Sequence, residues 1–221
     1  AIERRPMTER LTPLELMTKL ISFPTVSRDT NIPLIDWVAE YLASHGIESH
    51  RYVDPDQPKH ALFAHAGPWE EGAVVLSGHT DVVPVDGQAW DTDPFTVTEK
   101  DGRYYGRGTC DMKGFIACAL AMAPYYAARD LDRPIHFAFT HDEEVGCLGA
   151  ADLIAALEAR GVKPAMAIIG EPTEMRIIEG HKGCCEYTTR FTGLEGHGSD
   201  PDQGVNAAEY AVRYVSRLLE I

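Results

Sequence analysis

The stretch PIHFAFTHDEEVG, residues 134–146, joins a short apolar segment to three consecutive acidic residues. The apolar part is typical of a buried strand, and its length is that of a strand rather than a helix. Asp142, Glu143 and Glu144 follow it after Thr140 and His141, although neighbouring carboxylates repel one another and a fold does not need them. A cation held at the end of the strand would account for this charge.

Helices and strands alternate on both sides of this stretch. Helical spacing of apolar residues predicts helices over 12–23, 31–45, 112–129 and 148–161. Strands are predicted over 47–53, 61–67, 73–79 and 165–171, and Asp101-Gly102 indicates a hairpin. Thr12 is the expected N-cap of the first helix, and Gly46 the expected C-cap of the second. This alternation predicts an α/β fold, with a mixed, largely parallel sheet flanked by helices.

The character of the chain changes after about residue 180. A β-rich run over 185–193 is followed by a polar loop over 195–204 and an amphipathic helix over 205–221. A single strand–loop–helix unit cannot cover its own apolar face. We therefore expect a first domain over 1–181 and a second domain that begins at 182 and is cut short, so that the chain is a fragment.

Composition narrows the class of protein. The 221 residues carry a net charge of −14 and are 44% hydrophobic, which is ordinary for a soluble protein and argues against a nucleic-acid partner. The first residues lack the apolar core of a signal peptide, and no apolar run approaches the length of a membrane span. The five cysteines form no C-x-x-C pair. We expect a cytoplasmic protein with reduced thiols and no membrane partner.

Four segments share one pattern, in which a polar residue able to bind a metal adjoins the end of a strand or the start of a helix. These residues are His79 with Asp81, Asp111, Glu143 with Glu144, and Glu171. Neighbouring loops converge at the ends of strands in open α/β sheets, and ligands bind there. The four segments are therefore expected to meet on one rim of the sheet.

One histidine with several carboxylates suits Zn²⁺, Co²⁺ or Mn²⁺ at a catalytic site, because structural zinc prefers thiolates. Four ligands, one of them able to bridge, suggest two metal ions. Asp81 is placed to accept the second N–H of a metal-bound His79.

Each residue also has an ordinary structural alternative. His79 and Asp81 could form a turn, Asp111 could cap a helix, and Glu143-Glu144 could lie at a helix N-terminus. Glu171 could be a solvent-facing loop residue. The recurrence of the pattern in successive units favours the metal interpretation.

At this point the sequence resembles a known family. The segments that carry the resemblance are SGHTDVVPVDGQAWDTDPF (77–95), YGRGTCDMKGF (105–115), DEEVGCLGA (142–150), IIGEPTEM (168–175), EGHKG (179–183) and GHGSDPDQGVNA (196–207). Together, and in this order, they resemble the dinuclear metallo-amidohydrolases of the acetylornithine deacetylase, succinyl-diaminopimelate desuccinylase and carboxypeptidase G family. The sequences GEPTEM, HKG and GHGSDP are most similar to those of the acetylornithine deacetylase branch.

The resemblance implies a zinc-exopeptidase-like catalytic domain, into which a smaller α+β lid and dimerisation domain is inserted. It implies two divalent ions, Zn²⁺ or Co²⁺. His79 and Glu171 would hold one ion, Glu144 would hold the other, and Asp111 would bridge them. A further histidine ligand of the family lies beyond the inserted domain and has no counterpart within residues 1–221.

The resemblance also assigns the remaining site residues. Asp81 would orient His79, Glu143 would be the general base that activates the attacking water, and His197 would reach the site of a neighbouring subunit. The implied reaction removes the acetyl group from N-acetyl-L-ornithine or N-acetyl-L-citrulline in arginine biosynthesis. A di- or tripeptidase or another aminoacylase is the alternative with the same metal core. A non-catalytic binding module or inactive fragment is the alternative of another class.

Overall fold

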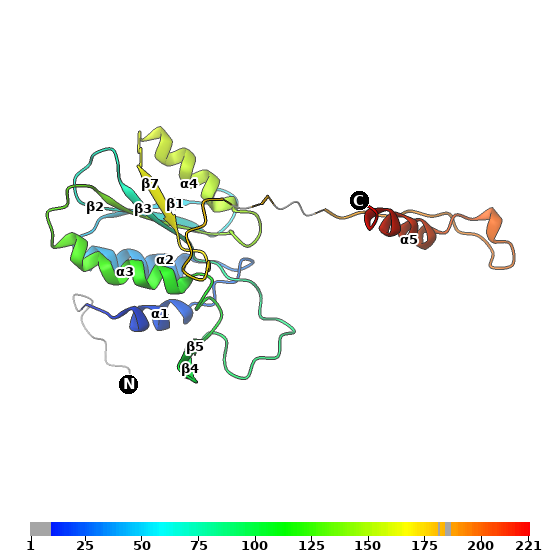
Figure 1. The fold of residues 1–221 in the computed structure, drawn as a ribbon, viewed down its shortest axis with the longest axis horizontal. Helices are drawn as coiled ribbons and strands as arrows, with labels where there is room; N and C mark the ends of the chain where they lie inside the picture. The colour runs from blue at the N-terminus through cyan, green and yellow to red at the C-terminus, as the bar shows by residue number, and fades with distance from the viewer. Residues whose placement is uncertain (1–9, 181, 184–186) are drawn as a thin grey trace. The chain divides into compact units, whose positions relative to one another are not determined.

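The computed structural model describes residues 10–180, 182–183 and 187–221 (Figure 1). The chain divides into two compact units, Ala1–Arg176 and Ile177–Ile221. The division lies close to the predicted domain boundary. The identity of the second unit as the start of a lid domain stays a prediction.

The first unit is built on a five-stranded sheet with the strand order β1-β2-β6-β3-β7. The strands are β1 (Ser49–Val53), β2 (His60–Ala66), β3 (Val74–His79), β6 (Ile135–Thr140) and β7 (Met166–Ile169). The β1–β2 and β2–β6 pairs are antiparallel, whereas β3 is parallel to both β6 and β7. The predicted mixed α/β sheet is therefore confirmed, with its parallel pairings confined to β6, β3 and β7.

Helices cover both faces of this sheet (Figure 1). Helices α1 (Pro13–Ile21), α2 (Ile32–Ser44) and α3 (Lys113–Ala127) lie on one side, and α4 (Leu148–Ala159) lies on the other. The alternation of side chains along β6 serves both layers: Phe137 and Phe139 belong to the larger core, whereas Ala138 packs in a smaller cluster with Leu153 of α4. Because both faces are buried, the strand has the nearly continuous apolar sequence from which it was predicted.

Local signals in the sequence end the elements as expected. Thr12 and Glu15 form a capping box at the start of α1, in which each side chain accepts a hydrogen bond from the other residue's backbone N–H. Gly46 follows α2 with a φ of 77°, the left-handed conformation that glycine adopts without strain. Asp101 and Gly102, both with positive φ, turn β4 (Thr98–Lys100) into β5 (Arg103–Tyr105).

The second unit contains a short 3₁₀ helix, η1 (Pro201–Gln203), and one longer helix, α5 (Ala207–Leu218). Of the predicted β-rich run 185–193, residues 187–193 are described and form no strand. A strand needs a neighbouring strand for its backbone hydrogen bonds, and in the described part of this unit only the isolated bridge between Leu194 and Val205 supplies one.

Across the ranges that the structure describes, no helix combines the length and the apolar character needed to cross a bilayer.

Candidate metal centre

The site begins where β3 and β6 end next to each other. His79 is the last residue of β3, is 2% exposed, and lies opposite Thr140 of β6 in the sheet register. Beyond this pair, the backbone N–H of Thr80 donates to the Thr140 carbonyl over 2.9 Å, so the two segments stay side by side past the end of the strands. Parallel pairing therefore brings the segment after β3 beside the segment after β6, as the sequence pattern predicts.

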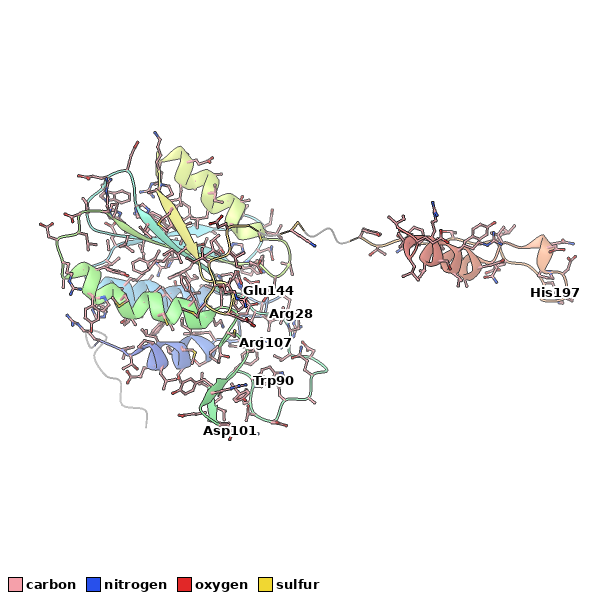
Figure 2. All side chains as sticks on the ribbon, in the orientation of Figure 1. Arg28, Trp90, Asp101, Arg107, Glu144 and His197 are labelled. Atoms are coloured by element: carbon pink, nitrogen blue, oxygen red, sulfur yellow. The ribbon has the colours of Figure 1, made fainter. Side chains whose placement is uncertain are left out.

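Four carboxylates surround the imidazole of His79. Its Nε2 atom lies 3.1 Å from Asp111 Oδ1, 3.7 Å from Glu171 Oε1 and 3.9 Å from Glu143 Oε2. Potential ligand atoms of His79, Asp111 and Glu144 lie within 4.8 Å of one another, as do those of His79, Glu143 and Glu171. The fold thus brings together all five residues, although they come from four separate segments of the chain; Figure 2 shows Glu144 in this unit.

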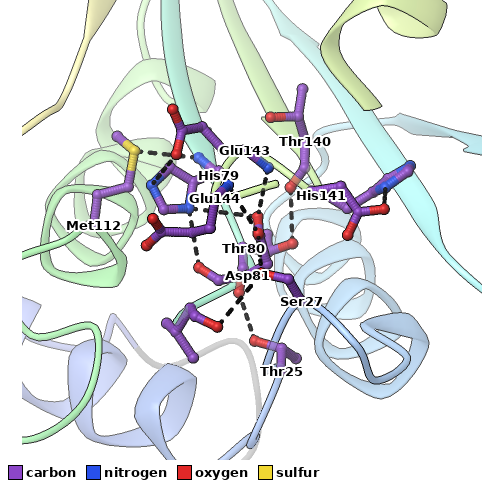
Figure 3. A network of polar contacts seen from close by, with 12 residues as sticks. Thr25, Ser27, His79, Thr80, Asp81, Met112, Thr140, His141, Glu143 and Glu144 are labelled. Carbon is purple, nitrogen blue, oxygen red and sulfur yellow. Dashed lines mark hydrogen bonds and ion pairs between the residues drawn. The ribbon is translucent and has the colours of Figure 1, made fainter. Parts of the chain in front are cut away.

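Asp81 connects the imidazole to the two glutamates. The Nδ1 atom of His79 donates to the main-chain carbonyl of Asp81 over 2.9 Å, whereas the nearer carboxylate oxygen of Asp81 is 3.5 Å away. The carboxylate instead accepts the backbone N–H groups of Glu143 and Glu144, at 3.2 and 3.3 Å, and the Ser27 hydroxyl at 2.7 Å (Figure 3). Asp81 therefore orients His79 chiefly through its backbone and positions the glutamates through its side chain.

The ordinary alternatives for two of these residues do not describe the geometry. The N-cap of α3 is Met112, and the carboxylate of Asp111 faces His79 instead. Helix α4 begins at Leu148 after Cys147, and the side chain of Glu143 lies toward His79.

The potential at the site is strongly negative. Burial opposes protonation of His79, but hydrogen bonds to Asp111 and Asp81, together with the charge of Glu171, outweigh it and raise the pKa of His79 to about 11. Burial is the largest cause that raises the pKa of Glu144, to about 7, and the negative charge of Asp111 is the second. Burial likewise raises the pKa of Glu171.

These shifts match what a cation site requires. Since the Nδ1 proton of His79 is held by a carbonyl, the Nε2 lone pair points at the carboxylates and is repelled by them unless a proton or a metal ion lies between. A donor set of one imidazole and four carboxylates is also that of a hard or borderline divalent metal. The residues present therefore fit a divalent metal centre.

His197 lies in the second unit (Figure 2). Its Nδ1 atom is 2.8 Å from Ser199 Oγ and accepts the Ser199 N–H over 3.3 Å. This local turn fixes the ring within the loop before η1. Its predicted role toward a neighbouring subunit stays a prediction.

Several residues that support the site were not predicted from the sequence. Ser27 bonds to Asp81, and Lys59 forms a buried ion pair with Asp142, the residue before Glu143. A lysine within a loop, at position 59, normally indicates an exposed residue, and nothing in its local sequence shows that it is 3% exposed. Only the unexplained acidic residue Asp142 could have indicated that a basic partner is needed.

Comparison with known proteins finds relatives that match most of the chain. The sequence profile described as "Peptidase family M20/M25/M40" matches residues 75–217. Acetylornithine deacetylase of Pasteurella multocida (strain Pm70) is 39% identical over 215 residues, which are 94% of this chain and 55% of that protein. The corresponding protein of Proteus mirabilis (strain HI4320) is 38% identical over 212 residues, 93% of this chain and 54% of that protein. The chain thus spans about half the length of these curated relatives.

Solved structures show the same fold. Human carnosine dipeptidase 1 is 25% identical, with a TM-score of 0.62 over 71% of this chain and 38% of that one. A tripeptidase from Staphylococcus aureus is 17% identical, with a TM-score of 0.62 over 96% of this chain and 57% of that one. The second similarity extends over both units of the chain.

Proposed function

We propose, on the premise that this chain belongs to peptidase family M20/M25/M40, that the intact protein removes the acetyl group from an N-acetyl amino acid. N-acetyl-L-ornithine and N-acetyl-L-citrulline are the proposed substrates, and arginine biosynthesis in the cytoplasm is the proposed setting. The curated relatives named acetylornithine deacetylase support this choice. The observation that carries it is the cluster of four carboxylates around the Nε2 atom of His79.

The proposed metal ligands follow from that cluster. His79 and Glu171 would hold one divalent ion, Glu144 would hold a second, and Asp111 would lie between them. Zn²⁺ or Co²⁺ would supply Lewis acidity toward the acyl carbonyl and lower the pKa of the attacking water. The raised pKa values of His79 and Glu144 support this proposal, because they report a negative potential that a cation would offset.

Glu143 is the proposed general base. Its side chain is 37% exposed, so water and substrate can reach it, and its Oε2 atom is 3.9 Å from His79 Nε2. The Glu143 carboxylate would take one proton from water as the water oxygen forms a bond to the acyl carbon. The same proton would then pass to the nitrogen as the C–N bond breaks, and the second proton of the water would follow it, so that acetate and the ammonium form of the amine are released.

Asp81 and His197 complete the proposed site. Asp81 would keep the Nδ1 proton of His79 in place and hold the backbone of Glu143 at the rim. His197 would stabilise the negative charge that develops on the acyl oxygen, from within a homodimer formed through the second domain.

The test is a deacylation panel with the intact protein and metal analysis on the same samples. The panel contains N-acetylornithine, N-acetylcitrulline, N-acetylmethionine, N-succinyl-diaminopimelate and dipeptides. We expect hydrolysis of an acetylated substrate, with metal bound. A protein that contains metal but cleaves none of the acylated compounds would refute the proposal.

A di- or tripeptidase is the second candidate, because two of the structural neighbours are human carnosine dipeptidase 1 and a tripeptidase from Staphylococcus aureus. Hydrolysis of dipeptides but not of N-acetyl amino acids would favour it. Absence of bound metal in the intact protein would instead favour a non-catalytic binding module.

A further inference from the structure

A buried ion pair lies directly behind the two glutamates of the metal centre. Lys59 and Asp142 have side chains that are 4% and 1% exposed, and the ammonium group of Lys59 contacts Asp142 Oδ1. Asp142 immediately precedes Glu143 and has a φ of 57°, so the chain turns sharply between β6 and the proposed ligands. A charged pair at such a depth destabilises the fold unless both partners are fully hydrogen-bonded.

The pair belongs to a closed ring of contacts. Lys59 Nζ also donates to the Ser27 carbonyl over 2.5 Å, and the Ser27 hydroxyl donates to Asp81 over 2.7 Å. The carboxylate of Asp81 in turn accepts the backbone N–H of Glu143, at 3.2 Å. Since Glu143 is covalently joined to Asp142, the ring returns to Lys59. Figure 3 shows the link from Ser27 through Asp81 to the glutamates.

Neighbouring contacts hold the Asp142 end of the ion pair. Gln57 donates to Asp142 Oδ2 over 3.3 Å, and His141 Nδ1 lies 3.2 Å from the same oxygen. Beyond the turn, the Leu148 N–H donates to the Asp142 carbonyl over 3.2 Å, which ties the start of α4 to this residue. The Asp142 carboxylate thus has partners on both oxygens.

Three neighbouring residues have the spacing of a further metal site, but a lysine lies beside one of them. Asp54, His141 and Asp142 could hold an ion by the spacing of their ligand atoms. The Lys59 ammonium already supplies the positive charge next to Asp142. The charge of Asp142 is therefore met by a side chain of the protein.

We propose that Lys59 is a positioning residue for Glu143 and Glu144, which acts by clamping Asp142 and Ser27 so that the turn after β6 directs both glutamates toward His79. The contacts of Lys59 are with Asp142 and Ser27 rather than with a proposed ligand, yet loss of such supporting contacts typically lowers metal affinity about 10- to 100-fold. The catalytic part of the inference rests on the proposed function; the metal-binding part does not.

The experiment breaks the ring at two points in the intact protein. Lys59→Met removes the ammonium group, and Ser27→Ala removes the hydroxyl that bonds to Asp81 with little change in volume. The double variant Lys59→Met/Asp142→Asn removes both charges and so avoids an uncompensated buried carboxylate. Lys163→Met is the matched control, because Lys163 is an exposed lysine paired with Glu71.

Three quantities are measured for each variant: the melting temperature, the affinity and stoichiometry of Co²⁺ binding by calorimetry, and kcat and KM for the best acetylated substrate. We expect Ser27→Ala and the double variant to bind Co²⁺ about 10- to 100-fold more weakly and to lose kcat with little change in KM. The double variant should melt within a few degrees of the wild type. The control Lys163→Met should match the wild type in every measurement.

Wild-type Co²⁺ affinity in both the double variant and Ser27→Ala would overturn the inference, whatever their melting temperatures. If Lys59→Met does not fold, the double variant still decides the question. If the wild-type protein hydrolyses no acetylated substrate, the proposed function fails, while the Co²⁺ measurement still tests the role of Lys59.

Discussion

Replacement of His136 by phenylalanine should make the protein less sensitive to acid: its free energy of unfolding should fall less than that of the wild type as the pH decreases. His136 lies on β6 opposite His65 of β2, is 3% exposed, and packs its ring 4.9 Å from that of Phe63. Neither of its ring nitrogens has a hydrogen-bond partner among the residues that the structure describes. Burial, and after it the charge of His65, lower the pKa of His136 to about 4.

The sign and size of the effect follow from linkage. In the unfolded chain the imidazole has its ordinary pKa of 6.5, so below that pH the unfolded state takes up a proton that the folded state refuses. The contribution of His136 to stability is therefore intact above pH 6.5 and is lost progressively as the pH falls toward about 4. The loss amounts to about 2 kcal/mol between about pH 7.5 and pH 5, and to about 3 kcal/mol in the limit.

The assay is urea unfolding of both proteins at several pH values between about 5 and 7.5, at equal metal content. Phenylalanine keeps an aromatic ring in the site, and any packing cost that it brings is independent of pH. Other titrating groups are common to both proteins, so the difference between their free energies of unfolding isolates His136. Parallel loss of stability in the two proteins across this range would refute the argument.

Three further predictions concern the metal centre and the first helix. Glu143→Gln should retain bound metal but lower kcat by about 10²- to 10⁴-fold, whereas Glu144→Ala should lose metal; a Glu143→Gln variant with most of the wild-type kcat would contradict the assignment. Chelation should lower the melting temperature and added Zn²⁺ or Co²⁺ should restore it, because metal at 100 times its Kd stabilises the folded state by about 3 kcal/mol; an unchanged melting temperature with and without metal would contradict the site. Thr12→Ala should cost about 1 kcal/mol through loss of the capping box, measured by urea unfolding, and an unchanged midpoint would count against that contact.

Most helices and strands of the first unit, and the segments that meet at the candidate site, could be predicted from the sequence. Caps, turns and hydrophobic spacing depend on residues within a few positions of one another, so Thr12, Gly46 and the Asp101-Gly102 turn could be interpreted locally. The pairing of His79 with Glu143 was also predictable, because parallel strands end at the same edge of a sheet.

The tertiary structure alone decided how the site is held. The local sequence around Asp81 does not show that its carboxylate bonds to the backbone of Glu143 and Glu144, which are 62 and 63 positions away. Nor does the sequence around Lys59 show that it is buried against Asp142, 83 positions away. These contacts form because a charged or polar group that folding removes from water raises the free energy of the folded state unless it is paired. Which partner it finds depends on the packing of distant segments, and that is information that no short stretch of sequence contains.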